Sequence, residues 1–251
     1  SSSGNAGAAL AGMAAAIGQP ATVFVPKAAP AAKVAQLLVY GAQVFLVDGN
    51  YDAAYELSQQ AANEFGWYCR NTGYNPFTLE GKKTAAFEIW EMVMADLPEG
   101  TTLSIFVSVG DGNIIAGLHK GFKDLQTLGW LDQMPRIYGI QAENSAAIAN
   151  AFQNHTENIE AVQAATVADS ISVDFPRDGV RALRAATQTG GAYLTVTDAE
   201  IIAAIAGLGP HGIFAEPAGA AAFAGYRKAL STGVISPESP ALVINTGSGL
   251  K

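Results

Sequence analysis

A chain of 251 residues with 49% hydrophobic and 14% charged residues has enough apolar side chains for a core and too few charges for a disordered or coiled-coil protein. Its net charge of −8 argues against binding to nucleic acid, which is a polyanion. The single cysteine, Cys69, excludes an internal disulfide framework and suits a reducing cytoplasm, and no stretch is typical of a membrane span or signal peptide.

Helices alternate with short apolar strands along the first part of the chain, a pattern typical of a parallel sheet covered by helices. We predict helices over 6–17, 32–40 and 51–65, and strands over 21–25, 43–47 and 67–70. These elements predict a smaller α/β domain of three to four strands over residues 1–74. A turn-rich stretch, 71–76, is interpreted as the crossing to a second domain.

The same alternation continues in the second part, for which we predict a larger α/β domain over residues 75–251. The predicted helices are 79–95, 114–125, 145–152, 180–187, 198–205 and 218–229. The predicted strands are 102–109, 135–140, 193–196 and 241–245. The fold class is therefore α/β, with two three-layer αβα domains and mostly parallel sheets.

The first candidate site is a small polar loop, Ser2-Ser3-Gly4-Asn5-Ala6, that leads into a helix. Backbone N–H groups and the helix dipole make such a turn a site for an anion, and hydroxyl groups add donors for a carboxylate. Taken alone, these residues are more simply read as an ordinary helix cap.

The second candidate is the strand, glycine turn and helix that contain Gly110, Asp111, Gly112 and Asn113. The glycines permit a tight backbone whose successive N–H groups face a phosphate. The next glycine, Gly117, comes two positions too late for a dinucleotide fingerprint, and no Gly-Lys-Ser/Thr follows as in a P-loop. The pattern favours a smaller phosphorylated ligand, with a plain turn as an equal alternative.

The third candidate lies at the end of the last strand, where Thr246 precedes a glycine-rich turn; ligands of open α/β sheets bind at such strand ends. Glu216 opens a helix and alone would be a dipole-stabilising acid. His119, His155 and His211 have no ligand spacing, so we predict structural or surface roles for them and no metal site.

These motifs, in this order, resemble the fold-type II (tryptophan synthase β-like) pyridoxal-phosphate enzymes, and most of all the threonine synthase-like group. The resemblance covers almost the whole chain. It rests on residues 2–5, 24–27, 33–37 with 40–42, 75–76 with 79–89, 140–143, 216–218 and 246–251.

The resemblance implies roles for the candidate residues. Gly110, Asp111, Gly112 and Asn113 would bind the phosphate of pyridoxal 5'-phosphate. Asn5, Glu216 and Thr246 would contact its ring, with Thr246 facing the pyridine nitrogen. The substrate would contact residues of the first loop and of the turn after Asn75, namely Ser2, Ser3, Gly4, Asn5, Ala6 and Thr78.

Three departures from the family pattern concern catalysis and substrate. The family's Schiff-base lysine precedes the asparagine loop, so we expect it outside this chain, which the resemblance predicts to be truncated at both ends. Lys123 imitates the lysine motif at the wrong place in the order and is predicted to be a surface residue. Ala6, Thr78 and Asp111 replace the family's threonine, arginine and asparagine, which puts a phosphorylated substrate in doubt.

We therefore predict a pyridoxal-phosphate dependent lyase that removes the α-proton of a small amino acid and eliminates or replaces its β- or γ-substituent. If the substrate is phosphohomoserine, the enzyme is a threonine synthase. One alternative is a serine/threonine dehydratase-like ammonia-lyase, which segment 166–171 also favours. Another is a catalytically inert paralogue that binds a small anion or a partner, and a nucleotide-binding protein is disfavoured by the glycine spacing. We expect a cytoplasmic homodimer that binds neither nucleic acid nor membrane.

Overall fold

The computed structural model describes residues 1–2, 4–98 and 100–250, which form two compact units, Ser1–Tyr74 and Asn75–Leu250. Each unit is described by itself. Both contain parallel strands joined through helices, which confirms the predicted mixed α/β fold with parallel sheets.

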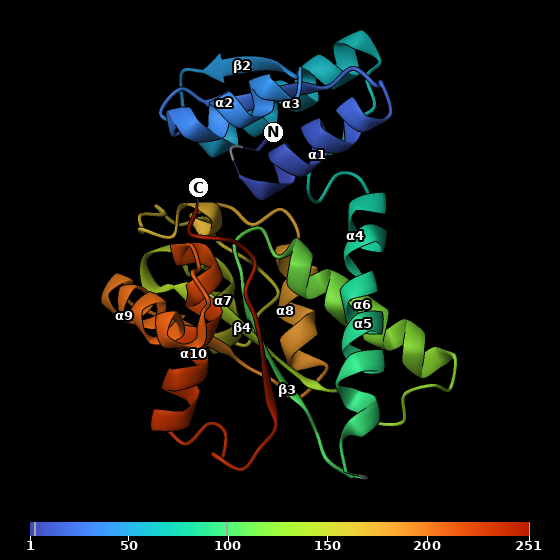
Figure 1. Cartoon of the computed structure of the whole chain (residues 1–251), viewed down its shortest axis with the longest axis vertical. Helices are drawn as coiled ribbons and strands as arrows, with labels where there is room; N and C mark the ends of the chain where they lie inside the picture. Colours follow the sequence, from blue (N-terminus) through green and yellow to red (C-terminus); the bar gives the residue numbers. More distant parts are fainter. Residues whose placement is uncertain (3, 99, 251) are drawn as a thin grey trace. The chain divides into compact units, whose positions relative to one another are not determined.

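The first unit is built on one parallel strand pair (Figure 1). Strand β1 (Thr22–Pro26) pairs with β2 (Gln43–Val47) in a register that places Phe24 opposite Phe45, and the two rings stack at 5.1 Å between centroids. Its helices are α1 (Asn5–Ala16), α2 (Ala31–Val39) and α3 (Tyr51–Phe65). The small core is made by Ala11, Val23, Val25, Leu37 and Ala42.

The predicted strand over 67–70 is wrong, because this segment forms no ladder with any strand in the described part of the chain. It follows the end of α3, where Gly66 adopts the left-handed conformation (φ 66°) of a helix C-cap. A cavity separates the segment from β1, so its backbone has no strand within hydrogen-bonding distance. The first unit therefore has two strands in its described residues where three to four were predicted.

The second unit contains a four-stranded parallel sheet with the order β5-β4-β3-β6. Its strands are β3 (Ser104–Ser108), β4 (Arg136–Ala142), β5 (Tyr193–Val196) and β6 (Ala241–Ile244). The central strand β3 is buried along its whole length. A strand inside a parallel sheet that is covered on both faces needs apolar side chains on both faces. The β-branched and aromatic residues of β3 meet this need.

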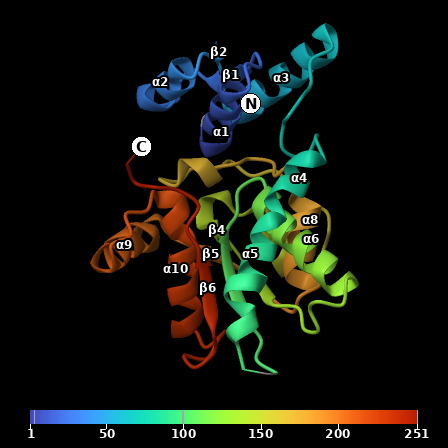
Figure 2. The same ribbon diagram turned by 45° about the vertical axis from the view of Figure 1, so that its right-hand side comes forward.

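Alternate residues of β3 enter two different cores. Ile105 and Val107 pack toward α6 and its neighbours, whereas Phe106 packs on the opposite face against Tyr138 and Tyr226. Figures 1 and 2 show α5 (Thr84–Met92), α6 (Asn113–Thr127) and α8 (Gly179–Thr187) on one side of the sheet and α9 (Asp198–Leu208) and α10 (Pro217–Ser231) on the other. This unit is thus a three-layer αβα arrangement, as predicted.

The single helix predicted over 79–95 is two helices, α4 (Phe77–Lys82) and α5, with a short 3₁₀ turn (Met94–Asp96) after them. The break is at Lys83, where the N–H of Ala86 bonds to the Lys83 carbonyl three residues earlier. Helix α6 approaches this junction so closely that a Cβ atom on Gly121 would collide with the Lys83 carbonyl oxygen. The contact between two backbones fixes the break, and the helical pattern of the sequence does not reveal it.

The remaining elements lie within a few residues of their predicted bounds. Among them is α7 (Ala147–Gln153), predicted over 145–152. Three short 3₁₀ turns (Glu143–Ser145, Asp169–Ile171 and Gly209–His211) were not predicted. The longest helices of residues 1–2, 4–98 and 100–250 have fifteen residues, and none is long and apolar enough to cross a membrane.

Candidate functional site

The loop between β3 and α6 leads into the N-terminus of a long helix. Gly112 is the N-cap of α6 with φ 88°, and the helix that it starts is fifteen residues long. The first N–H groups of an α-helix have no partner within the helix, and the helix dipole adds positive potential at this end. The sequence prediction of a strand, a glycine turn and a helix at this position is confirmed.

Glycine is required at both predicted positions of this loop, although for different reasons. A Cβ atom on Gly110 would lie 2.9 Å from the Cα of Ile171, so only a bare backbone fits there. At Gly112 a Cβ atom would lie 2.5 Å from the Ala182 Cβ, and the positive φ is itself unfavourable for other residues. The two glycines therefore let the loop backbone pack closely against residues 171–173 and against Asp178 and Ala182.

The loop is held by the segment before α8. The N–H of Arg177 donates to the Asp111 carboxylate (3.1 Å), and the N–H of Asp178 donates to the Asp111 carbonyl (2.9 Å). The Asp178 carboxylate accepts a 2.5 Å hydrogen bond from Asn113 Nδ2 and pairs with Arg181 Nη1 at 2.8 Å. The Asp111 carboxylate is therefore engaged by a backbone donor, which reduces the repulsion that an acid in this loop would exert on an anion.

One atom of the loop is left open. Asn113 is 5% exposed, and its amide oxygen Oδ1 has no hydrogen-bond partner among the residues that the structure describes. Buried acceptors are normally satisfied, so this oxygen is open to a donor that the described residues do not supply.

Parallel pairing brings the end of β6 to the same edge of the sheet. Val107 is opposite Ile244, so Gly110 and Thr246 each lie a few residues beyond paired positions. Glu216 is 6% exposed, and its N–H donates to the Gly247 carbonyl at 3.0 Å. A Cβ atom on Gly247 would collide with Glu216 Oε1, so this glycine leaves the space that the carboxylate occupies. The predicted residues Gly110, Asp111, Gly112, Asn113, Glu216 and Thr246 are thus at one edge of one sheet.

The start of α10 is fixed to β3 from the same side. The N–H of Ala222 donates to the Ser108 hydroxyl at 2.9 Å, and both residues are buried. Asn245 Oδ1 accepts a long hydrogen bond from the Gly247 N–H (3.4 Å) and occupies the space that a Cβ atom on Gly219 would need. The helix that carries Glu216 therefore has little freedom to move relative to the loop of Gly110.

The remaining predicted residues of the substrate loop belong to the first unit. Helix α1 starts at Asn5 with Gly4 as its N-cap, and the Gly4 N–H donates to the Ser2 hydroxyl at 3.2 Å. The Ser2 N–H donates to the carbonyl of Phe24, in the middle of β1 (3.3 Å). A Cβ atom on Gly7 would lie 2.6 Å from the Ser2 carbonyl, so the loop packs tightly on α1. Ser3 lies outside the described residues.

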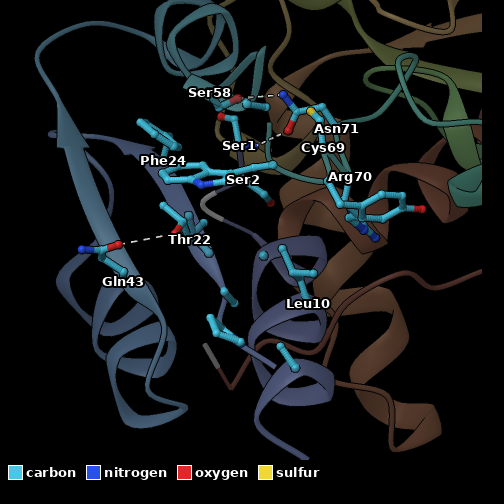
Figure 3. A pocket seen from close by; sticks show the side chains of 18 of the residues that line it. Ser1, Ser2, Leu10, Thr22, Phe24, Gln43, Ser58, Cys69, Arg70 and Asn71 are labelled. Atoms are coloured by element: carbon cyan, nitrogen blue, oxygen red, sulfur yellow. Dashed lines mark hydrogen bonds between the residues drawn. The ribbon is translucent and has the colours of Figure 1, made fainter. Parts of the chain in front are cut away.

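A cavity of about 660 Å³ lies in the first unit between β1, α1, α3 and the segment 67–71 (Figure 3). Two of the predicted residues, Ser2 and Ala6, line it. Asn71 is a polar anchor in its wall: its Oδ1 accepts from the Ser1 amino group (2.5 Å), and its Nδ2 donates to the Ser58 hydroxyl (2.7 Å). Cys69 also lines this cavity.

Arg70 is a residue that the sequence analysis did not select. It carries the one charged side chain among the described residues that line the cavity. Burial lowers the pKa of its guanidinium, while the nearby Tyr51 and Tyr68 act in the opposite direction. The usable signal in the sequence was an arginine inside an otherwise uncharged apolar segment.

The other predicted residues have local roles. The Thr78 hydroxyl donates to the Asn75 carbonyl at 2.8 Å in the first turn of α4. Lys123 is exposed on α6, as predicted for a surface residue. His119 is buried on the same helix, and its burial, followed by the charge of Lys123, lowers its pKa to about 4. Within the described residues, no group of three or more His, Cys, Asp or Glu side chains could hold a metal ion.

Comparison with known proteins gives the class. The sequence matches the pyridoxal-phosphate dependent enzyme family over residues 1–247, and the chain belongs to this family.

Among curated relatives, the threonine synthase of Methanocaldococcus jannaschii is 38% identical over 253 residues, and that of Mycobacterium tuberculosis is 34% identical over 255 residues. Each match covers 100% of this chain but only 61% and 67% of the relative, respectively. The chain thus spans roughly three fifths to two thirds of the length of the relatives it matches.

Solved structures give the same fold. The processed form of threonine deaminase isoform 2 from Solanum lycopersicum superposes with a TM-score of 0.78 at 20% identity, covering 99% of this chain and 69% of that one. Maize serine racemase superposes with a TM-score of 0.76 at 23% identity, covering 99% and 72%. At these identities the likeness concerns the fold alone.

The loop of the second unit fits the phosphate of the family's cofactor. Gly110 and Gly112 permit the tight turn between β3 and α6, the start of α6 supplies N–H donors, and the Asp111 carboxylate is already held by the Arg177 N–H. The site contains no dinucleotide or P-loop pattern, which agrees with a small phosphorylated cofactor.

Proposed function

We propose that the chain is the main part of a pyridoxal-phosphate dependent lyase of the threonine synthase-like group. The observation that carries the proposal is the glycine turn of Gly110 and Gly112 at the start of α6, at the same edge of the sheet as Glu216 and Thr246. The identity of 34–38% with threonine synthases supports the reaction class. Alone, the likeness to solved structures supports only the fold.

In this proposal the second unit binds the cofactor. Backbone N–H groups of Gly110, Asp111, Gly112 and Asn113 would hold the phosphate, and Glu216 and Thr246 would contact the ring. Pyridoxal phosphate supplies an electron sink for the substrate's α-carbon. The Thr246 hydroxyl would tune that sink, because a hydroxyl opposite the ring nitrogen does not hold it protonated as a carboxylate would. Such a weaker sink suits elimination better than transamination.

The first unit would supply the substrate side. Ser2, Ser3, Gly4, Asn5 and Ala6 would take the substrate carboxylate at the start of α1, with Asn5 also contacting the cofactor ring. Thr78, at the start of α4, would belong to the same side. Residues 1–74 would then form the substrate domain and residues 75–251 the cofactor domain. We further propose a cytoplasmic homodimer.

The substrate is a small amino acid, and two observations favour different leaving groups. Arg70 provides a guanidinium in the first unit that could pair with a phosphorylated substrate, which favours threonine synthase chemistry. Ala6 has no polar side chain for such a phosphate, and Thr78 is uncharged and its hydroxyl already donates to the Asn75 carbonyl. The alternative is therefore a serine/threonine dehydratase-like ammonia-lyase.

The test is a product assay on the native protein loaded with pyridoxal phosphate. Phosphohomoserine, L-threonine and L-serine are offered in turn, and the release of threonine, phosphate, ammonia and 2-oxo acid is measured. Threonine with an equal amount of phosphate supports the threonine synthase. Ammonia with 2-oxo acid from threonine or serine supports the alternative. Failure to bind pyridoxal phosphate would overturn both and leave the inert paralogue.

Substituting Arg70 sharpens the choice. For a phosphorylated substrate, Arg70→Met should raise KM about tenfold or more with a smaller change in kcat, because a charge-assisted pair is lost on binding. The exposed Arg136→Met is the matched control and should leave both constants unchanged. An unchanged KM for Arg70→Met would remove this residue from the substrate site.

A further inference from the structure

The segment that holds the cofactor loop is centred on a buried acid that neither the motifs nor the family match singles out. Asp178 is the N-cap residue of α8, and its side chain is 1% exposed. A carboxylate in such a place is costly unless it is paired and hydrogen-bonded. It has two partners, Asn113 Nδ2 at 2.5 Å and Arg181 Nη1 at 2.8 Å.

Asp178 contacts the loop through its backbone as well. Its N–H donates to the Asp111 carbonyl at 2.9 Å, and its carbonyl oxygen would lie 3.2 Å from a Cβ atom on Gly112. The peptide between Asp111 and Gly112 is planar and trans, so its carbonyl and N–H point in opposite directions. Because the carbonyl faces Asp178, the Gly112 N–H faces away from Asp178.

The Asp178 carboxylate also contacts the next residue of the loop, Asn113. It fixes the Asn113 side chain, whose backbone is the first turn of α6. Asp178 therefore contacts three successive residues of the loop between β3 and α6: the carbonyl of Asp111, the backbone of Gly112 and the side-chain amide of Asn113. Arg177, the preceding residue, engages the Asp111 carboxylate with its N–H.

We propose that Asp178 is a positioning residue for the phosphate of the cofactor: it orients the backbone N–H groups of Gly112 and Asn113 toward the anion without touching it. The inference rests on the proposed binding of pyridoxal phosphate. If Asp178 has this role, its loss should weaken the binding of ligands that carry a phosphate and spare those that do not, because only a phosphate depends on the N–H groups of the loop. Loss of a purely structural acid would weaken both alike.

The experiment compares pyridoxal phosphate with pyridoxal, which lacks the phosphate, by absorption or fluorescence titration of the full chain. Inorganic phosphate is added as a competitor. For Asp178→Ala we expect the affinity for pyridoxal phosphate to fall about tenfold or more, as for loss of one hydrogen bond to a charged group. Competition by phosphate should weaken in parallel. The affinity for pyridoxal should change less than about twofold, since no N–H of the loop holds it.

Two further variants keep the test decisive if Asp178→Ala does not fold. Asp178→Asn has the same shape but turns one donor toward the Asn113 amide, and it should lose affinity for pyridoxal phosphate in the same way. Asn113→Ala removes the other partner of the same hydrogen bond but keeps the backbone N–H, and it should also lose affinity for pyridoxal phosphate. Asp132→Asn, an exposed acid on another loop, is the matched control and should behave as the wild type.

The outcomes separate the two proposals. Wild-type protein that binds no pyridoxal phosphate overturns the proposed function and this inference with it. Wild-type binding that Asp178→Ala and Asp178→Asn leave intact overturns the inference alone. An equal loss of affinity for pyridoxal phosphate and pyridoxal also overturns it, because it indicates general damage. Loss of affinity for pyridoxal phosphate but not for pyridoxal, in the Asp178 variants and in Asn113→Ala, supports it.

Discussion

The two units contain strands of similar apolar sequence, but these strands differ in how many neighbours they pair with and in how far they are buried. In the second unit β3 has a partner on each side, β4 and β6, and helices on both faces, so every residue of the strand is buried. In the first unit β1 pairs only with β2 in the described chain, and a cavity of about 660 Å³ lies along its other side. Whether a segment forms a strand thus depends on a neighbouring strand with which it can pair. The segment 67–70 has a composition typical of a strand but pairs with no strand of the described chain.

The difference extends to the sites. The second unit positions its candidate residues on backbone that neighbouring elements fix from several sides, as Asp178 does for the loop of Gly112. In the first unit the loop is held by the Ser2 bonds to Phe24 and Gly4 and by its packing on α1 at Gly7. Rigid support of this kind is what a binding site for a fixed cofactor requires.

The largest expected effect concerns the two cores. Phe106→Ala in β3 removes a fully buried ring that stacks on Tyr138 at 4.8 Å, and it should lower the free energy of unfolding by about 3–5 kcal/mol. Phe45→Ala in β2 removes a ring that is 43% exposed and should cost much less, about 1 kcal/mol. Urea denaturation measures both. Equal losses would contradict the stated difference between the two sheets.

The next effect concerns the cofactor loop. Gly112→Ala combines a positive φ with a contact of 2.5 Å to the Ala182 Cβ, so we expect a loss of about 1–3 kcal/mol in stability and at least about tenfold in affinity for pyridoxal phosphate. Gly129→Ala is the matched control, because it has φ 74° but no atom within 4 Å of the added Cβ. It should cost about 1 kcal/mol and leave cofactor binding unchanged. Equal effects on binding would remove the loop from the site.

A smaller effect concerns pH. Burial lowers the pKa of His119 to about 4 in the folded chain, below the ordinary value of 6.5. The unfolded chain therefore binds more protons between these values, and stability contributed by the neutral His119 is complete above pH 6.5 and is lost as the pH falls toward 4.

Replacing this residue should flatten that dependence. His119→Gln should reduce the slope of unfolding free energy against pH between 6.5 and 4 by up to about 1.4 kcal/mol per pH unit. The exposed His211→Gln serves as the control and should keep the wild-type slope. A variant of His119 with the full wild-type slope would show that another group is responsible.

The smallest effect concerns the ion pairs that join α4 to α6. Lys83 and Lys120 each contact both Glu80 and Asp124 at 2.7–3.0 Å. Burial works to raise the pKa of Asp124, but the hydrogen bonds from the two lysines outweigh it and lower the pKa. Asp124→Asn should reduce the urea midpoint slightly, and the reduction should shrink in high salt because these side chains are partly exposed. A salt-independent loss would indicate packing instead.

Much of the second unit is predictable from its sequence because the decisive signals are local. The β-branched run of β3, the glycines of the loop and the start of α6 follow one another within about ten residues, and the structure has them as predicted. The edge of the sheet that gathers Gly110 and Thr246 follows from the rule that parallel strands end together. Their roles toward the cofactor stay predictions.

What the sequence could not provide are contacts between distant residues. Asn113 and Asp178 are 65 positions apart, and no spacing rule connects them. The break at Lys83 depends on the approach of Gly121 from another helix. Arg70 was passed over because its position in the wall of a cavity becomes visible only when β1 and α1 are in place.

Phosphate binding by the loop of the second unit is the central claim, and one measurement tests it directly. Titration of the wild-type chain with pyridoxal phosphate and with pyridoxal gives two affinities under the same conditions. We predict that pyridoxal phosphate binds about a hundredfold more tightly or better, since its phosphate receives several charge-assisted hydrogen bonds. Equal affinities for the two ligands would contradict the claim.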